Sequence, residues 1–179
     1  VFSRFTSAFA ASTDTADQAQ FDVLRLLESH GVAFGAHQNA YTSFDETVYE
    51  LHVPLDDMTL FPQFLGALKK FCFDIRVSER DVQQEKSIIV EEWRESQGAS
   101  SRLADAYAKE LFAGTKYADR MPIGKMEMVQ AATSESVKAF YKRLYRPEVA
   151  CIIVVGDFDD VDVVVEAIHS TFEGIPRGQ

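Results

Sequence analysis

Residues 78–96 read SERDVQQEKSIIVEEWRES and predict a helix of about five turns. Ser78 is a favourable N-cap, and the acids Glu79 and Asp81 follow it in the first turn, where they suit the positive end of a helix dipole. No Gly or Pro interrupts the pattern before Ser96. We therefore take this helix as the element around which the rest of the chain is arranged.

One face of this helix combines acids with aliphatic side chains. Val82, Glu85, Ile89 and Glu92 follow the three-four spacing of a single helical stripe. The two carboxylates lie about 10 Å apart along the axis, a separation that suits one ligand and one supporting carboxylate around a cation. A surface helix whose stripe faces water at its edges would show the same spacing. The helix alone leaves both interpretations open.

Composition excludes several classes of protein. The chain has 179 residues, of which 46% are hydrophobic, so it is long and apolar enough for a folded, soluble domain with a sizeable core. No apolar run has the length of a membrane span. The formal net charge of −10 disfavours nucleic acid and anionic membranes as partners and is compatible with peptides. No convincing signal peptide is visible, and the compartment stays open, with organellar and secreted locations both compatible.

Hydrophobic periodicity predicts an α+β fold: a sheet of mainly antiparallel strands with helices packed on one face. The expected helices, in chain order, cover 17–31, 57–73, 78–96, 100–112, 133–146 and 161–172. Two strands are expected within 35–54, joined by a tight turn at residues 43–46. The continuous apolar run 149–155 is typical of a strand buried on both faces. Residues 115–124 are expected to form a loop because of their Gly and Pro content.

Four blocks of the sequence together resemble one family. In chain order they are NAYTSFDETVYELHVP (39–54), EKSIIVEEWRE (85–95), PIG (122–124) and FYKRLYRPEVACIIVVGDF (140–158). Their order and spacing resemble the N-terminal portion of the pitrilysin/insulinase family of zinc peptidases, the inverzincins, over about residues 21–172. The resemblance implies a zinc-dependent metalloendopeptidase or processing peptidase, built from repeated α+β domains that close around a peptide or unfolded polypeptide.

The resemblance also implies roles for individual residues. Glu92 matches the distal carboxylate ligand of the zinc, and Glu85 matches an acid that supports the site from outside the ligand set. Asn39 and Ala40 match the strand edge along which the substrate backbone is bound. Glu91 lies about 100° around the helix from Glu92 and is expected to face solvent.

One part of the family's pattern is missing from the chain. The family's H-x-x-E-H, which supplies two zinc-binding histidines and the general base, does not occur in these 179 residues. We expect it just upstream of Val1, with residues 1–20 as a connector, 21–174 as the peptidase-like domain and 175–179 as the start of a linker. Zinc therefore needs two histidines from outside this chain, and the chain alone is expected to be inactive.

Two interpretations of this absence remain. In the first, the chain is part of an active peptidase and works with the remaining domains of the same protein. In the second, it belongs to a non-catalytic homologue, a structural or partner-binding subunit of a processing peptidase or a respiratory complex. Both Glu85 and Glu92 are present, which favours the first interpretation, since a subunit without metal has no use for two acids on an apolar stripe.

Overall fold

The computed structural model describes residues 25–33 and 36–177. Its elements, in order, are β1 (Gln38–Thr42), β2 (Thr47–Leu51), η3 (Met58–Leu60), α3 (Phe61–Phe73), α4 (Glu79–Glu95), α5 (Ala99–Leu111), η4 (Lys116–Asp119), α6 (Met126–Ala131), α7 (Ser134–Leu144), η5 (Pro147–Val149) and α8 (Val161–Phe172). Residues 25–29 are also helical. The expected connector 1–20 and the first part of the expected helix 17–31 lie outside the described residues.

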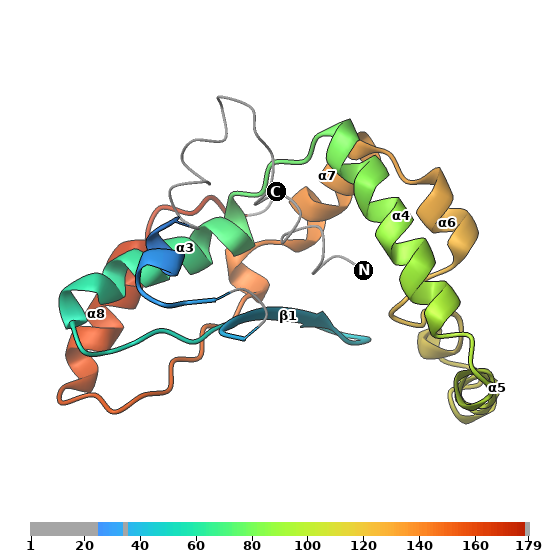
Figure 1. The fold of residues 1–179 in the computed structure, drawn as a ribbon, viewed down its shortest axis with the longest axis horizontal. Helices are drawn as coiled ribbons and strands as arrows, with labels where there is room; N and C mark the ends of the chain where they lie inside the picture. Colours follow the sequence, from blue (N-terminus) through green and yellow to red (C-terminus); the bar gives the residue numbers. More distant parts are fainter. Residues whose placement is uncertain (1–24, 34–35, 178–179) are drawn as a thin grey trace.

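The two strands form the predicted antiparallel hairpin (Figure 1). Thr42 is paired with Thr47, and the backbone N–H of Ser43 donates to the carbonyl oxygen of Glu46 at 2.9 Å, which closes the turn 43–46. Each strand has five residues and is shorter than expected. In the described part of the chain, β1 and β2 together form a two-stranded sheet.

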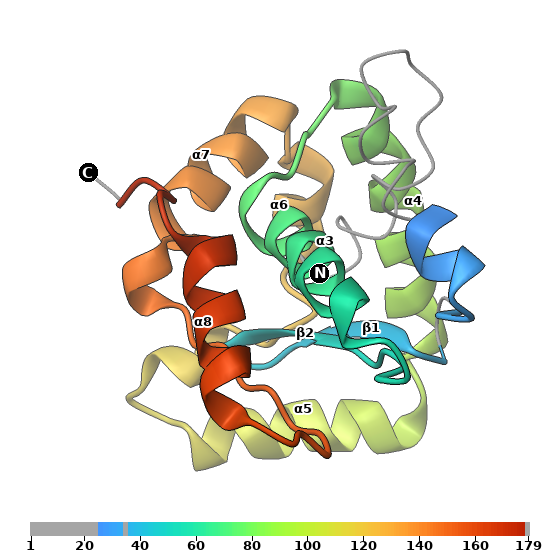
Figure 2. The same cartoon turned by 90° about the vertical axis from the view of Figure 1, so that its left-hand side faces the viewer.

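Helices cover one face of this hairpin. Leu27, Phe64 and Phe71 form a buried cluster, against which Tyr49 and Leu51 of β2 pack. These two strand residues are two positions apart and so point to the same face. Figure 2 shows α3 above the strands, with α8 beside it. The arrangement confirms the α+β class.

The last helix packs on α3 rather than on the strands. Phe61 and Leu65 of α3 and Val164 of α8 form a second buried cluster. Lys69 Nζ donates to the carbonyl oxygen of Thr171 at 2.6 Å, near the C-terminal end of α8, where a positive charge is favoured by the helix dipole. The prediction of an amphipathic helix over 161–172 is confirmed.

The prediction for residues 149–155 is wrong. The segment begins in η5 and then runs as extended chain without a strand ladder. Val154 packs against the α3–α8 cluster, whereas Ile153 and Val155 are 81% and 91% exposed. A strand covered on both faces needs neighbours in its sheet and a layer on each side. The described residues provide a cover for one face alone.

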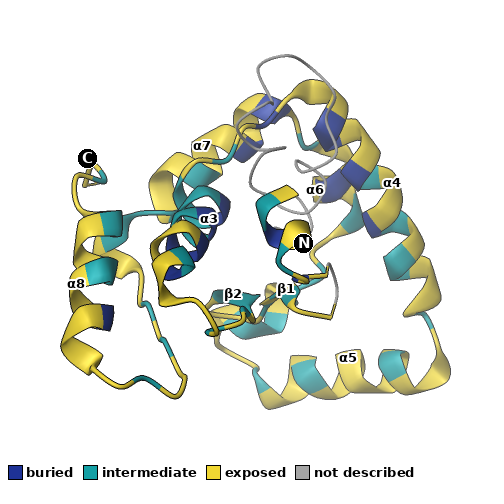
Figure 3. Cartoon of the chain, turned by 60° about the vertical axis from the view of Figure 1, so that its left-hand side comes forward, coloured by how far each residue is buried: buried dark blue, intermediate teal, exposed yellow. Residues whose placement is uncertain are grey.

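The helix expected over 100–112 is present as α5, and its apolar side is exposed. Leu103, Tyr107 and Leu111 are 64%, 72% and 73% exposed, and Figure 3 shows α5 apart from the buried residues of α3 and α4. Among the described residues, no helix combines the length and the apolar character that a bilayer crossing requires.

Candidate metal and substrate site

Helix α4 starts where the sequence predicted, because its first turn is capped from both sides. The backbone N–H of Asp81 donates to Ser78 Oγ at 3.2 Å, and the backbone N–H of Ser78 donates to Asp81 Oδ2 at 3.0 Å. This reciprocal capping box satisfies two N–H groups that the helix itself leaves without an acceptor. It fixes the register of the whole helix, and thereby the direction of every side chain along it.

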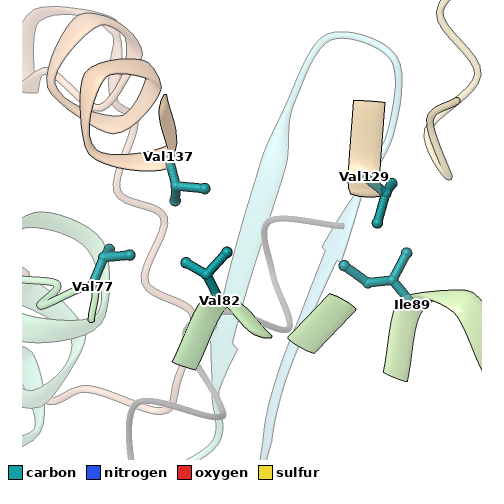
Figure 4. Packing of buried hydrophobic residues seen from close by; sticks show 5 residues of the cluster. All are labelled: Val77, Val82, Ile89, Val129 and Val137. Atoms are coloured by element: carbon teal, nitrogen blue, oxygen red, sulfur yellow. The ribbon is translucent and has the colours of Figure 1, made fainter. Parts of the chain in front are cut away.

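The aliphatic members of the α4 stripe lie in the core. Val82 and Ile89 are 0% and 1% exposed, and they pack with Val129 of α6 and Val137 of α7 (Figure 4). Val77, just before α4, completes this cluster. The centre of the stripe, Val82 to Ile89, is therefore buried, and its C-terminal end at Glu92 is half-buried.

The two acids of the stripe differ in burial. Glu85 is 2% exposed. Glu92, two turns further along, is half-buried. Glu91 faces solvent as expected: its side chain is 65% exposed and pairs with Arg94 at 2.5 Å. The structure thus places Glu85 in the core, Glu92 at an intermediate depth and Glu91 in solvent.

Charged side chains of α4 also bind the ends of its neighbours. Glu79 Oε2 accepts a hydrogen bond from the backbone N–H of Ser134, the first residue of α7, at 2.9 Å. Lys86 Nζ donates to the carbonyl oxygen of Gln130, near the end of α6, at 2.9 Å. An anion at a helix N-terminus and a cation at a helix C-terminus both interact favourably with the helix dipole. Both contacts therefore hold α4 in place against α6 and α7.

We expect the Glu79 contact to make stability pH-dependent. The hydrogen bond from Ser134 N–H lowers the pKa of the Glu79 carboxyl below its usual range. A carboxyl with a lowered pKa stabilises the fold above its unfolded pKa, about 4.3, and loses that contribution as the pH falls through the lowered value. Glu79→Gln should therefore lower the melting temperature at neutral pH, and the difference from wild type should disappear in acid.

The matched control for this prediction is Glu110→Gln, on the exposed side of α5. It should leave the melting temperature close to that of wild type at neutral pH. A Glu79→Gln effect of the same size at pH 7 and at pH 3 would contradict the prediction.

The residues predicted to bind substrate lie on β1. Asn39 is exposed and Ala40 is half-buried, and the backbone N–H of Ala40 donates to Asn39 Oδ1 at 2.9 Å. Within the described part of the chain β1 has β2 as its strand neighbour, and its second edge carries no strand. An edge strand of this kind can accept an added strand by main-chain pairing. The contacts described for Asn39 and Ala40 lie within the hairpin and do not connect them to α4.

Sequence reasoning missed a group of half-buried phenols formed by Tyr49, Tyr141 and Tyr145. Tyr49 Oη donates to Tyr145 Oη at 3.2 Å, the rings of Tyr141 and Tyr145 lie 4.8 Å apart, and Tyr141 Oη donates to the carbonyl oxygen of Cys72 at 2.9 Å. Burial raises the pKa of Tyr49 and Tyr145, and that of Tyr141 to about 12, so these phenols stay protonated near neutrality. The available signal was the i, i+4 spacing of Tyr141 and Tyr145. The group connects β2 to α7.

Comparison with known proteins places the chain in a family. Residues 5–121 match the model of insulinase (peptidase family M16), and residues 131–179 match the model of the peptidase M16 inactive domain. The chain belongs to the insulinase family of peptidases, family M16. This confirms the family resemblance drawn from the four sequence blocks.

The relatives are much longer than this chain. It is 38% identical over 166 residues to a zinc protease PQQL-like protein of Arabidopsis thaliana, covering 93% of this chain and 17% of the relative. It is 29% identical over 150 residues to the chloroplastic stromal processing peptidase of Oryza sativa subsp. japonica, covering 81% of this chain and 12% of the relative. The crystal structure of the first half of the periplasmic protease PqqL from Escherichia coli superposes with a TM-score of 0.82 at 31% identity, covering 97% of this chain and 36% of that one. The chain spans less than a fifth of the length of these two sequence relatives.

The residues of α4 fit part of a zinc site. Carboxylate oxygens are accepted zinc ligands, and Glu85 and Glu92 share the inner side of one helix. A catalytic zinc requires three protein ligands. Residues 25–33 and 36–177 contain no group of three or more His, Cys, Asp or Glu side chains that could hold a metal ion. His37 lies at the base of the hairpin, where its Nδ1 accepts the backbone N–H of Ala33 at 3.1 Å. The described residues thus offer carboxylates for such a site but not the full ligand set.

Proposed function

We propose that the intact protein is a zinc-dependent metalloendopeptidase that hydrolyses peptide bonds, and that this chain contributes the distal glutamate ligand and the substrate-binding strand. The observation that carries the proposal is the pair of acids on α4, Glu85 buried and Glu92 half-buried two turns further along, in a member of peptidase family M16. Carboxylate oxygens are accepted ligands of zinc, and a carboxylate outside the ligand set commonly supports such a site.

The roles follow from the positions of the side chains. Glu92, half-buried near the end of α4, holds the metal together with two histidines from outside this chain. Glu85 lies within the core and fixes the position of the inner side of α4. When bound, zinc supplies a Lewis acid for the scissile carbonyl and lowers the pKa of a water molecule at the site.

The substrate is proposed to bind as an added strand. The open edge of β1 at Asn39 and Ala40 pairs with the backbone of a peptide or unfolded polypeptide. Main-chain pairing makes limited demands on substrate sequence. The remaining partners are further domains of the same protein or a homologous subunit, and a periplasmic or organellar location is in keeping with the named relatives.

Metal removal tests the proposal. Full-length protein should contain zinc and hydrolyse fluorescein-labelled casein; 1,10-phenanthroline should abolish hydrolysis, and added Zn²⁺ should restore it. Hydrolysis should depend on zinc because none of the side chains described in α4 or the hairpin can act as the Lewis acid in its place. Hydrolysis that survives complete zinc removal would contradict the proposal. A full-length protein with neither zinc nor hydrolysis would instead support the non-catalytic homologue.

A further inference from the structure

The tip of the hairpin is attached to the segment that follows α5. Phe44, in the turn between β1 and β2, lies against Phe112 and Tyr117, with ring centroids 5.5 and 5.1 Å away. Phe112 and Tyr117 themselves are 5.7 Å apart, so the three rings form a closed triangle of tilted and edge-to-face contacts. We call this triangle, together with Asp45, the hairpin-tip clamp.

A hydrogen bond completes the clamp. The Tyr117 hydroxyl lies 2.9 and 2.8 Å from the two carboxylate oxygens of Asp45 and donates to them. The same contact raises the pKa of Tyr117, so the phenol keeps the proton that it donates. The two residues are 72 positions apart in sequence, so the bond joins two separate parts of the fold.

The clamp connects the two elements of the proposed site. The turn that bears Phe44 and Asp45 follows directly after β1, whose open edge carries Asn39 and Ala40. On the other side, Phe112 is the C-cap of α5, and α5 begins four residues after the end of α4. In Figure 1 the hairpin points away from α8, toward the side of the fold that carries α4 and α5. The clamp thus attaches the hairpin to the part of the fold that carries α4, the proposed metal-ligand helix.

A hairpin of this size needs such an attachment. Two isolated strands are marginally stable in water, and the helical cover reaches β2 through α3. Strand addition requires the receiving edge to be held straight, since ordering it on binding would lower affinity. The turn end of β1 is held by the clamp and by the 3.0 Å contact between the Thr42 and Thr47 hydroxyls.

We propose that the hairpin-tip clamp positions β1 as the peptide-binding edge, with Asp45 and Tyr117 as positioning residues that act through the turn. The inference rests on the proposed function, in which β1 receives the substrate. Neither residue belongs to the proposed metal site. Loss of their hydrogen bond therefore affects peptide binding and leaves the chemical step in place.

The test uses full-length Tyr117→Phe and Asp45→Asn and a fluorescein-labelled casein peptide. Each variant should raise KM by about three- to tenfold, the range that corresponds to the loss of one ordinary hydrogen bond, and leave kcat within about twofold of wild type. The double variant should be no worse than the poorer single variant, because both substitutions remove the same bond. Tyr107→Phe, on α5 and 72% exposed, is the matched control and should leave KM unchanged.

Peptide affinity measured by fluorescence anisotropy on zinc-free protein separates the possible failures. An unchanged KM and an unchanged Kd in Tyr117→Phe would overturn the inference. A fall in kcat equal to the loss in kcat/KM, together with a lower melting temperature, would also overturn it, since that result indicates general destabilisation. A wild-type protein without hydrolysis contradicts the proposed function. In that case the peptide Kd alone tests the clamp, and a Kd about three- to tenfold weaker in Tyr117→Phe than in wild type would support it.

Discussion

Glu92→Gln in the full-length protein should remove bound zinc and reduce peptide hydrolysis by more than about 100-fold. Loss of a residue that merely supports a ligand costs about 10- to 100-fold in metal affinity or activity, and loss of a ligand should exceed the upper end of that range. A Gln amide has nearly the shape of the carboxylate but lacks its charge. Because Glu92 is half-buried and lies beyond the α4 core cluster, the substitution should leave the fold in place.

Glu91→Gln is the matched control, since it makes the same chemical change one residue earlier on the same helix. Glu91 is exposed and paired with Arg94, and exposed pairs contribute little to stability. This variant should keep both zinc and activity. Zinc content by atomic emission and casein hydrolysis measure the two effects. Zinc retained at wild-type occupancy in Glu92→Gln would contradict the assignment of Glu92 as a ligand.

The part of the fold that the sequence predicted best is α4. Its cap and its length depend on residues close together in the chain, and the structure confirms both. The burial of Val82 and Ile89 depends on α6 and α7, which come later in the chain. Sequence spacing could therefore identify the stripe but could not decide between core and surface.

Elements that depend on distant neighbours were predicted poorly. The apolar run 149–155 has the composition of a buried strand, yet strand formation requires partners, and the described residues supply none for it. Helix α6 was missed because six residues are too few to show a helical period. Residues 115–124 were expected to form a loop because of their Gly and Pro content, and the 3-10 helix η4, which carries Tyr117, lies within them.

In the candidate site, too, residues matched by local sequence differ from contacts between distant parts of the chain. Asn39, Ala40, Glu85 and Glu92 were found as sequence matches to a family, and their roles remain predictions. The Asp45–Tyr117 contact joins residues 72 positions apart, so no local pattern could reveal it. The resemblance thus proposes residues for a substrate-binding strand and a metal site, whereas the Asp45–Tyr117 contact could be found only in the structure.

Ile89→Ala should have the largest effect on stability. Ile89 is 1% exposed and packs with Val129 of α6 in the cluster that supports α4. Truncating a buried isoleucine to alanine costs about 2–5 kcal/mol, which is a large share of the roughly 5–15 kcal/mol by which a domain is stable. Hydrogen exchange of the protected α4 amides in the full-length protein should accelerate by about 30-fold or more, since each factor of ten corresponds to about 1.4 kcal/mol.

The adjacent residue provides the control, because Ile88 is 42% exposed and the same truncation there removes little buried surface. Ile88→Ala should change the stability by no more than about 0.5 kcal/mol, since alanine also has the higher helix propensity. Zinc affinity should fall in Ile89→Ala and not in Ile88→Ala, because the cluster around Ile89 fixes the helix that carries both carboxylates. Equal exchange rates in the two variants would mean that the packing of α4 on α6 does not hold the proposed metal-ligand helix in place.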